Sequence, residues 1–175
     1  ARSGVCRQAV TAQKKNPMRK LLTFNMITLD GFFEGPQQSI DWHNVDAEFN
    51  DFAEEQLNTF DMIVFGRVTY EGMASFWPTP FAIETDPVIA AKMNAFPKIV
   101  ISRTLDKADW NNTRLIKDNV AEEITRLKRQ PGKDLAIFGS ANLTASLMGM
   151  GLVDEFRIMV NPVVLGQGTP LFKGV

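Results

Sequence analysis

Histidine and cysteine are almost absent from this chain of 175 residues, which contains one of each, His43 and Cys6. A single cysteine cannot form a disulfide within the chain, and such scarcity fits a reducing compartment such as the cytoplasm. With so few soft ligands, neither a multi-histidine metal site nor a Cys/His zinc site can be assembled. The sequence also lacks an apolar run of the roughly 18–20 residues that cross a membrane. We therefore expect neither a metal centre nor a membrane partner.

Basic residues show no excess, since the chain has 19 Lys and Arg, 20 Asp and Glu, and a net charge of −1. Residues 1–17 hold four of the basic residues and no acid, so the remainder has 15 basic and 20 acidic residues and sums to −5. That balance argues against nucleic acid as a partner. Residues 1–17 lack the apolar core of a secretory signal. We expect them to be a leader or vector-derived tail outside the fold, with a basic targeting segment as the alternative.

Apolar runs rich in β-branched residues alternate with segments of helical periodicity. The runs that predict strands cover residues 20–31, 61–66, 98–103 and 134–140, with a short strand inside 109–117 and a last one inside 153–172. The segments that predict helices cover 46–60, 67–77, 86–96, 119–133 and 141–151, and residues 32–42 are expected to form a loop. Several strands are almost wholly apolar, which is typical of a parallel sheet covered on both faces. We therefore expect a single α/β domain over residues 18–175, with a mostly parallel central sheet flanked by helices.

Polar side chains follow three of the predicted strands at the point where each strand ends. These residues are Arg67 and Thr69 after "MIVFG", Arg103 and Thr104 after "KIVIS", and Ser140 and Asn142 after "LAIFG". Ligands of parallel sheets bind at the carboxyl ends of the strands, where helix N-termini attract anions and arginine clamps phosphate. The pattern fits a dinucleotide phosphate site as well as it fits ordinary strand ends beside surface arginines. Neither G-x-G-x-x-G nor the P-loop motif is present.

Taken together, several motifs resemble the dihydrofolate reductase-like superfamily, in the bacterial branch related to the C-terminal reductase domain of the bifunctional riboflavin-biosynthesis deaminase-reductase. In chain order they are "MITLDGFFEG", "DWH", "FGRVTYEGM" with "FWP", "KIVISRTL", "DLAIFGSANLTASLMGMGLVDEF" and "NPVVLGQGTPLF". The resemblance covers essentially residues 18–172, and its most specific part is the combination of "FGRVTYEGM" with "GSANL". It implies the three-layer dihydrofolate reductase-like fold, NADPH as cofactor and a homodimer.

The resemblance also implies which residues hold NADPH. The turn that holds the phosphates corresponds to Gly66, Arg67 and Thr69. The next strand end, near the adenosine ribose and its 2′-phosphate, corresponds to Ser102, Arg103 and Thr104. The late helix start, against the pyrophosphate and nicotinamide, corresponds to Gly139, Ser140, Ala141, Asn142 and Leu143. The first loop, which begins at Thr28, borders the nicotinamide and the substrate.

Two early acids, Asp30 and Glu48, are the candidates for a catalytic group beside the hydride acceptor, where a proton is often needed. The facing candidates for the substrate pocket are Trp42, Phe49 and Phe52. These candidates also have structural interpretations. Asp30 precedes a glycine, and aspartate before glycine is a common turn residue. An acid early in a helix is commonly solvated, and a loop tryptophan commonly serves packing.

The sequence departs from the family pattern in two places that matter here. Gly139-Ser140 stands where folate reductases carry a Gly-Gly pair, and the chain stops at Val175 where the family continues into a closing hairpin. That hairpin is either cut from this chain or supplied elsewhere, and its loss would expose a sheet edge.

The resemblance predicts an NADPH-dependent oxidoreductase that acts on a CH–NH or CH–OH group. We expect hydride transfer to a small heterocyclic or ribosylamino-pyrimidine substrate, similar to 5-amino-6-(5-phosphoribosylamino)uracil reductase of riboflavin biosynthesis. Two alternatives remain open, namely a dihydrofolate reductase-like activity on a pteridine in the same site and a non-catalytic nucleotide-binding dimer.

Overall fold

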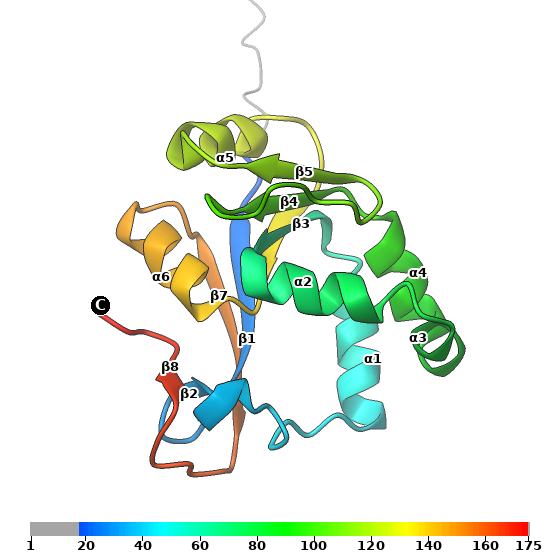
Figure 1. Cartoon of the computed structure of the whole chain (residues 1–175), viewed down its shortest axis with the longest axis vertical. Helices are drawn as coiled ribbons and strands as arrows, with labels where there is room; N and C mark the ends of the chain where they lie inside the picture. Colours follow the sequence, from blue (N-terminus) through cyan, green and yellow to red (C-terminus); the bar gives the residue numbers. More distant parts are fainter. Residues whose placement is uncertain (1–17, 175) are drawn as a thin grey trace, which may run out of the picture.

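A six-stranded parallel sheet forms the centre of the protein (Figure 1). The computed structural model describes residues 18–174, so the expected tail over residues 1–17 lies outside the described residues. The strand order is β5-β4-β3-β6-β1-β7, and every neighbouring pair is parallel. The strands are β1 (Leu21–Thr28), β3 (Phe60–Gly66), β4 (Lys98–Ile101), β5 (Thr113–Ile116), β6 (Asp134–Phe138) and β7 (Glu155–Asn161). The mostly parallel sheet expected from the apolar strands is therefore confirmed.

Helices cover both faces of this sheet and complete three layers. They are α1 (Ala47–Gln56), α2 (Arg67–Phe76), α3 (Pro80–Thr85), α4 (Pro87–Ala95), α5 (Val120–Lys128) and α6 (Ala141–Gly149). On one face Tyr70 of α2 and Met93 of α4 belong to a core that contains Phe65 of β3. On the other face Ile124 of α5 and Leu147 of α6 belong to a second core. None of the helices within residues 18–174 is long and apolar enough to cross a membrane.

Three short elements differ from the expectation. The loop expected over residues 32–42 contains β2 (Phe32–Glu34), which pairs with β8 (Thr169–Pro170), and a 3-10 turn, η1 (Pro36–Gln38). Strands this short have too few residues to show alternation. Helix α3 was not predicted. Pro80 occupies its first helical position, after an N-cap in which Thr79 Oγ1 accepts a hydrogen bond from the Ala82 N–H at 3.2 Å.

A buried lysine fastens the start of β4 to the end of α4. Lys98 is 1% exposed, and its Nζ donates hydrogen bonds to the carbonyl oxygens of Asn94, Phe96 and Asn111 at 3.1, 2.8 and 3.1 Å. Nζ also lies 4.3 Å from the centroid of the Trp110 ring. Burial lowers the pKa of Lys98 to about 8. The carbonyl groups at the helix C-terminus and the indole ring favour the charged form and oppose that shift.

We predict that the wild-type protein gains stability relative to a Lys98→Met variant as pH rises from 8 to 10.5. The unfolded lysine keeps its proton up to its ordinary pKa, whereas the folded one releases it earlier, so the unfolded state binds more protons in this window. The free energy of unfolding of the wild type then rises with pH, by at most about 3 kcal/mol. Urea titrations across the window measure this difference. The exposed Lys117→Met variant is the control, and parallel pH curves for the wild type and Lys98→Met would contradict the prediction.

Candidate functional site

Ser140 joins two helix N-termini at the carboxyl edge of the sheet. Its Oγ accepts a hydrogen bond from the Gly66 N–H at 3.1 Å and lies 2.7 Å from Thr69 Oγ1. Gly66 is the N-cap of α2 and Ser140 is the N-cap of α6, and neither helix has a side-chain hydrogen bond at its cap. The N–H groups in the first turns of both helices are therefore open to an anionic ligand.

Close packing explains the two glycines at this junction. A Cβ atom at Gly66 would lie 2.8 Å from Ser140 Oγ, and a Cβ atom at Gly139 would lie 3.2 Å from Thr69 Cγ2. Gly139 also has a φ of +60°, a left-handed conformation that costs glycine little. Ser140 adopts the same region with a φ of +57°, which is uncommon for a residue with a side chain. The glycines therefore let the two helix ends approach each other, in addition to any room that they leave for a ligand.

The two predicted arginines lie at the ends of neighbouring strands. Arg67 opens α2 directly after β3, and its Nη1 forms an exposed ion pair with Glu71 at 2.8 Å. Arg103 follows the end of β4, which pairs with β3 at Gly66 and Ile101, and its side chain is exposed. Both guanidinium groups therefore belong to the edge that carries the open helix ends.

Several other predicted cofactor residues have structural contacts of their own. Ser102 is 9% exposed, and its Oγ accepts hydrogen bonds from the N–H groups of Thr104 and Leu105 at 3.2 and 3.0 Å. Thr28 is fully buried and accepts a hydrogen bond from the Phe32 N–H at 2.9 Å. These two hydroxyl groups fix the turns at the ends of β4 and β1. On α6, Ala141 and Leu143 are buried and Asn142 is exposed.

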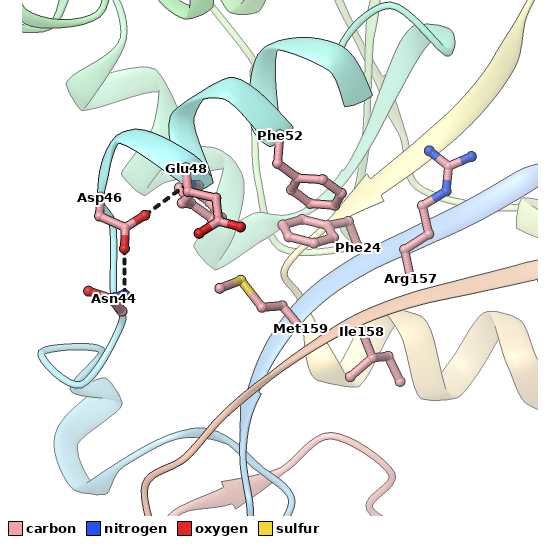
Figure 2. A pocket seen from close by; sticks show the side chains of 9 residues that line it. Phe24, Asn44, Asp46, Glu48, Phe52, Arg157, Ile158 and Met159 are labelled. Carbon is pink, nitrogen blue, oxygen red and sulfur yellow. Dashed lines mark hydrogen bonds between the residues drawn. The ribbon is translucent and has the colours of Figure 1, made fainter.

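A cavity of about 580 Å³ lies between α1 and the strands β1 and β7 (Figure 2). Its lining residues are Phe24, Asn44, Asp46, Glu48, Phe49, Phe52, Arg157, Ile158 and Met159. The ring of Phe24 lies 5.7 Å from the ring of Phe52 and 6.3 Å from that of Phe138, the residue before Gly139. The cavity wall is therefore in direct contact with the strand that leads into the open end of α6.

The start of α1 brings Glu48, Phe49 and Phe52 to the cavity. Asp46 is the N-cap of α1, and its Oδ1 accepts a hydrogen bond from the Phe49 N–H at 2.9 Å, which fixes where the helix begins. Trp42 is not among the lining residues. Its ring instead packs edge-on against His43, with ring centroids 4.4 Å apart.

Asp30 holds a loop and does not line the cavity. Its carboxylate accepts hydrogen bonds from the Thr28 hydroxyl at 2.6 Å and from the N–H groups of Leu165 and Gly166 at 3.3 and 2.8 Å. The Thr28 hydroxyl and the Gly166 N–H hold the pKa of Asp30 below its ordinary value. The charged carboxylate therefore connects the turn after β1 to the glycine-rich loop between β7 and β8.

We predict that Asp30→Asn loosens the glycine-rich loop, because an amide oxygen accepts hydrogen bonds more weakly than a carboxylate. Backbone amide exchange of residues 163–168 should become several-fold faster, as hydrogen–deuterium exchange with mass spectrometry can measure. Since the folded pKa is lowered, the wild-type loop keeps this protection above the ordinary pKa and loses it as pH falls through the folded value. Asp106→Asn in an exposed loop is the control. Unchanged exchange in Asp30→Asn would contradict the assigned contact.

Three lining residues on β7 were missed from the sequence: Arg157, Ile158 and Met159. Arg157 and Met159 alternate along the strand and so share one face of the sheet. The register pairs them with Phe24 and Met26 of β1. The signal available in the sequence was a charged residue, Arg157, next to the apolar run Ile158–Val160 of β7. Among residues 18–174 no group of His, Cys, Asp or Glu is arranged to hold a metal ion.

Comparisons with known proteins place the chain in a sequence family. Residues 19–175 match the sequence model of the RibD C-terminal domain. The chain is 38% identical to the uncharacterized protein YyaP of Bacillus subtilis over 159 residues, which cover 90% of this chain and 82% of YyaP. It is 29% identical to the uncharacterized protein YwjB of the same organism over 156 residues, covering 88% of this chain and 83% of YwjB.

Two solved structures share the fold. A candidate riboflavin biosynthesis protein from Shewanella sp. PV-4 has a TM-score of 0.65 at 23% identity, covering 89% of this chain and 84% of that one. A diaminohydroxyphosphoribosylaminopyrimidine deaminase/5-amino-6-(5-phosphoribosylamino)uracil reductase from Thermotoga maritima has a TM-score of 0.63 at 12% identity. The match covers 90% of this chain but 48% of the Thermotoga chain.

Proposed function

Because the chain belongs to the RibD C-terminal domain family, we propose that it is an NADPH-dependent reductase of a small heterocyclic substrate, nearest to a ribosylamino-pyrimidine. The observation that carries this proposal is the meeting of two open helix N-termini at Ser140, next to a cavity with aromatic walls. Bound NADPH would supply the hydride. The protein's own contribution would be to bind, orient and shield the reacting groups.

The residues at the carboxyl edge fit a dinucleotide phosphate group. The first turns of α2 and α6 offer N–H groups without a side-chain cap, which suit the pyrophosphate. Arg67 adds a positive charge at the same helix start, although its ion pair with Glu71 already uses part of its donor capacity. Arg103, one strand farther along the edge, would bind the 2′-phosphate of the adenosine ribose, which its position beside β3 supports. Thr69, Ser140 and the glycines hold the two helix ends in position.

We predict that Arg103→Ala weakens NADPH binding by roughly 10- to 100-fold and NADH binding by far less, because one charge-assisted contact to the 2′-phosphate is lost. Titration of both cofactors by fluorescence or calorimetry measures the two affinities. Arg129→Ala, an exposed arginine at the end of α5, is the control. Equal losses for the two cofactors would place Arg103 at the pyrophosphate. If the wild-type protein bound neither cofactor, the proposed function would be wrong.

Glu48 is the acid that we propose beside the substrate. It lies in the first turn of α1 and lines the cavity, whereas Asp30 is occupied by the loop contacts described above. Hydride addition to the carbon of a C=N group leaves the nitrogen in need of a proton, and a carboxyl group at the cavity can deliver it directly or through a water molecule. Phe24, Phe49 and Phe52 would hold a flat ring in place.

We predict that Glu48→Gln lowers kcat by about 10²- to 10⁴-fold, as expected for loss of a general acid, while the dissociation constant of NADPH stays the same. The assay follows NADPH absorbance with ribosylamino-pyrimidine and pteridine substrates, which separates the pyrimidine and folate alternatives. Glu55→Gln, on an exposed position of the same helix, is the control. A Glu48→Gln variant that turns over as fast as the wild type would exclude this residue as the acid. Absence of turnover in a wild type that binds NADPH would favour the non-catalytic alternative.

We also propose that the protein acts as a homodimer in the cytoplasm. Within residues 18–174 the outer edge of β7 pairs with no strand, and Phe156 and Val160 on this strand are 39% and 52% exposed, which supports the dimer.

A further inference from the structure

Arg157 places a positive charge at the end of the cavity opposite Glu48. Figure 2 shows the two side chains separated by the rings of Phe24 and Phe52. Arg157 is the only Lys or Arg among the residues that line the cavity, and the acids Asp46 and Glu48 both lie at the start of α1. The cavity is therefore bipolar, with carboxylates at one end, a guanidinium group at the other and an aromatic surface between them.

The guanidinium group is fixed in place before any ligand binds. Its Nε donates to Glu155 Oε1 at 2.7 Å, and its Nη1 donates to Gln56 Oε1 at 2.6 Å and to Thr59 Oγ1 at 2.9 Å. These contacts join β7 to the C-terminal end of α1. Because they already restrict the rotamers of Arg157, a ligand would not have to order this side chain on binding.

Two donors of the group remain for a ligand. A guanidinium has five N–H bonds, and the three contacts above use the one on Nε and both on Nη1. The two N–H bonds of Nη2 have no partner within residues 18–174. The carboxylate of Glu155 does not fully neutralise the arginine, because Lys20 Nζ shares it at 3.0 Å. Arg157 therefore keeps both charge and donor capacity at this end of the cavity.

We propose that Arg157 determines substrate specificity by binding an anionic oxygen substituent of the heterocycle. This inference rests on the proposed reductase function and adds to it a substrate class and an orientation. The substrate is a flat ring that carries a negatively charged group at the end facing Arg157 and amino or imino nitrogen toward Glu48. A ligand in the reverse orientation would bring its anion to the two carboxylates of α1, where like charges repel it.

The test compares two flat probes that differ by one charge, uracil-6-carboxylate and uracil-6-carboxamide. Ligand-detected NMR titrations give their affinities for the wild type, Arg157→Gln and Arg157→Lys. We expect the wild type to bind the carboxylate roughly tenfold more tightly than the amide. Arg157→Gln should reduce this ratio to about one, whereas Arg157→Lys should retain part of it because the charge remains. Arg129→Gln, on the opposite face of the sheet, should behave as the wild type.

Several outcomes would overturn the proposal. These are equal affinities of the two probes for the wild type, no binding of either at millimolar concentration, or an unchanged ratio in Arg157→Gln. Complete loss of the ratio in Arg157→Lys would show that charge is not what the site recognises. Displacement of uracil-6-carboxylate by equimolar inorganic phosphate would mean that a free anion binds and that the ring contributes nothing. Thermal melting and NADPH titration of every variant establish that it is folded. The probe comparison needs no turnover, so it fails or succeeds independently of the reductase assay.

Discussion

The contact of Ser140 with Gly66 and Thr69 is the constraint on which the candidate cofactor site depends. It crosses between β3 and β6, neighbours in the sheet, and so fixes the start of α2 relative to the start of α6. Because the two helices begin at one edge and neither uses a side chain as its cap, their dipoles and open N–H groups act on the same space. A larger residue at position 66 or 139 would push these helix ends apart.

The parallel sheet connects this edge to the cavity. Phe24 of β1 pairs in register with Phe138 of β6 and with Arg157 of β7. Phe24 thus has on one side Phe138, which leads into the N-terminus of α6, and on the other side the strand position of Arg157. The aromatic contacts of Phe24 with Phe49 and Phe52 then set how closely α1 approaches the sheet, and with it the width of the cavity. The carboxyl edge of the sheet and the cavity are consequently connected through neighbouring strands of the same sheet.

The sequence predicts the layers well and the site unevenly. Apolar strands and helical periodicity are local patterns, and the strands and helices that they predicted were confirmed. Local patterns do not reveal which side of a turn a side chain faces. Asp30 therefore looked like a candidate acid, whereas it binds a loop 135 residues farther along the chain. Arg157 was not predicted as a site residue, because its partners Gln56 and Thr59 lie about 100 residues earlier in the sequence.

The same long-range contacts explain how the cavity holds a charge at the Arg157 end. Arg157 is partly buried, with a side chain that is 25% exposed, and a charge removed from water needs partners. Glu155, Gln56 and Thr59 meet that need with three hydrogen bonds, all from groups outside the cavity lining. These three groups stabilise the charge, while the two N–H bonds of Nη2 remain available to a ligand. The contact between α1 and β7 thus gives the cavity a positive charge at one end, with the acids at the start of α1 at the opposite end.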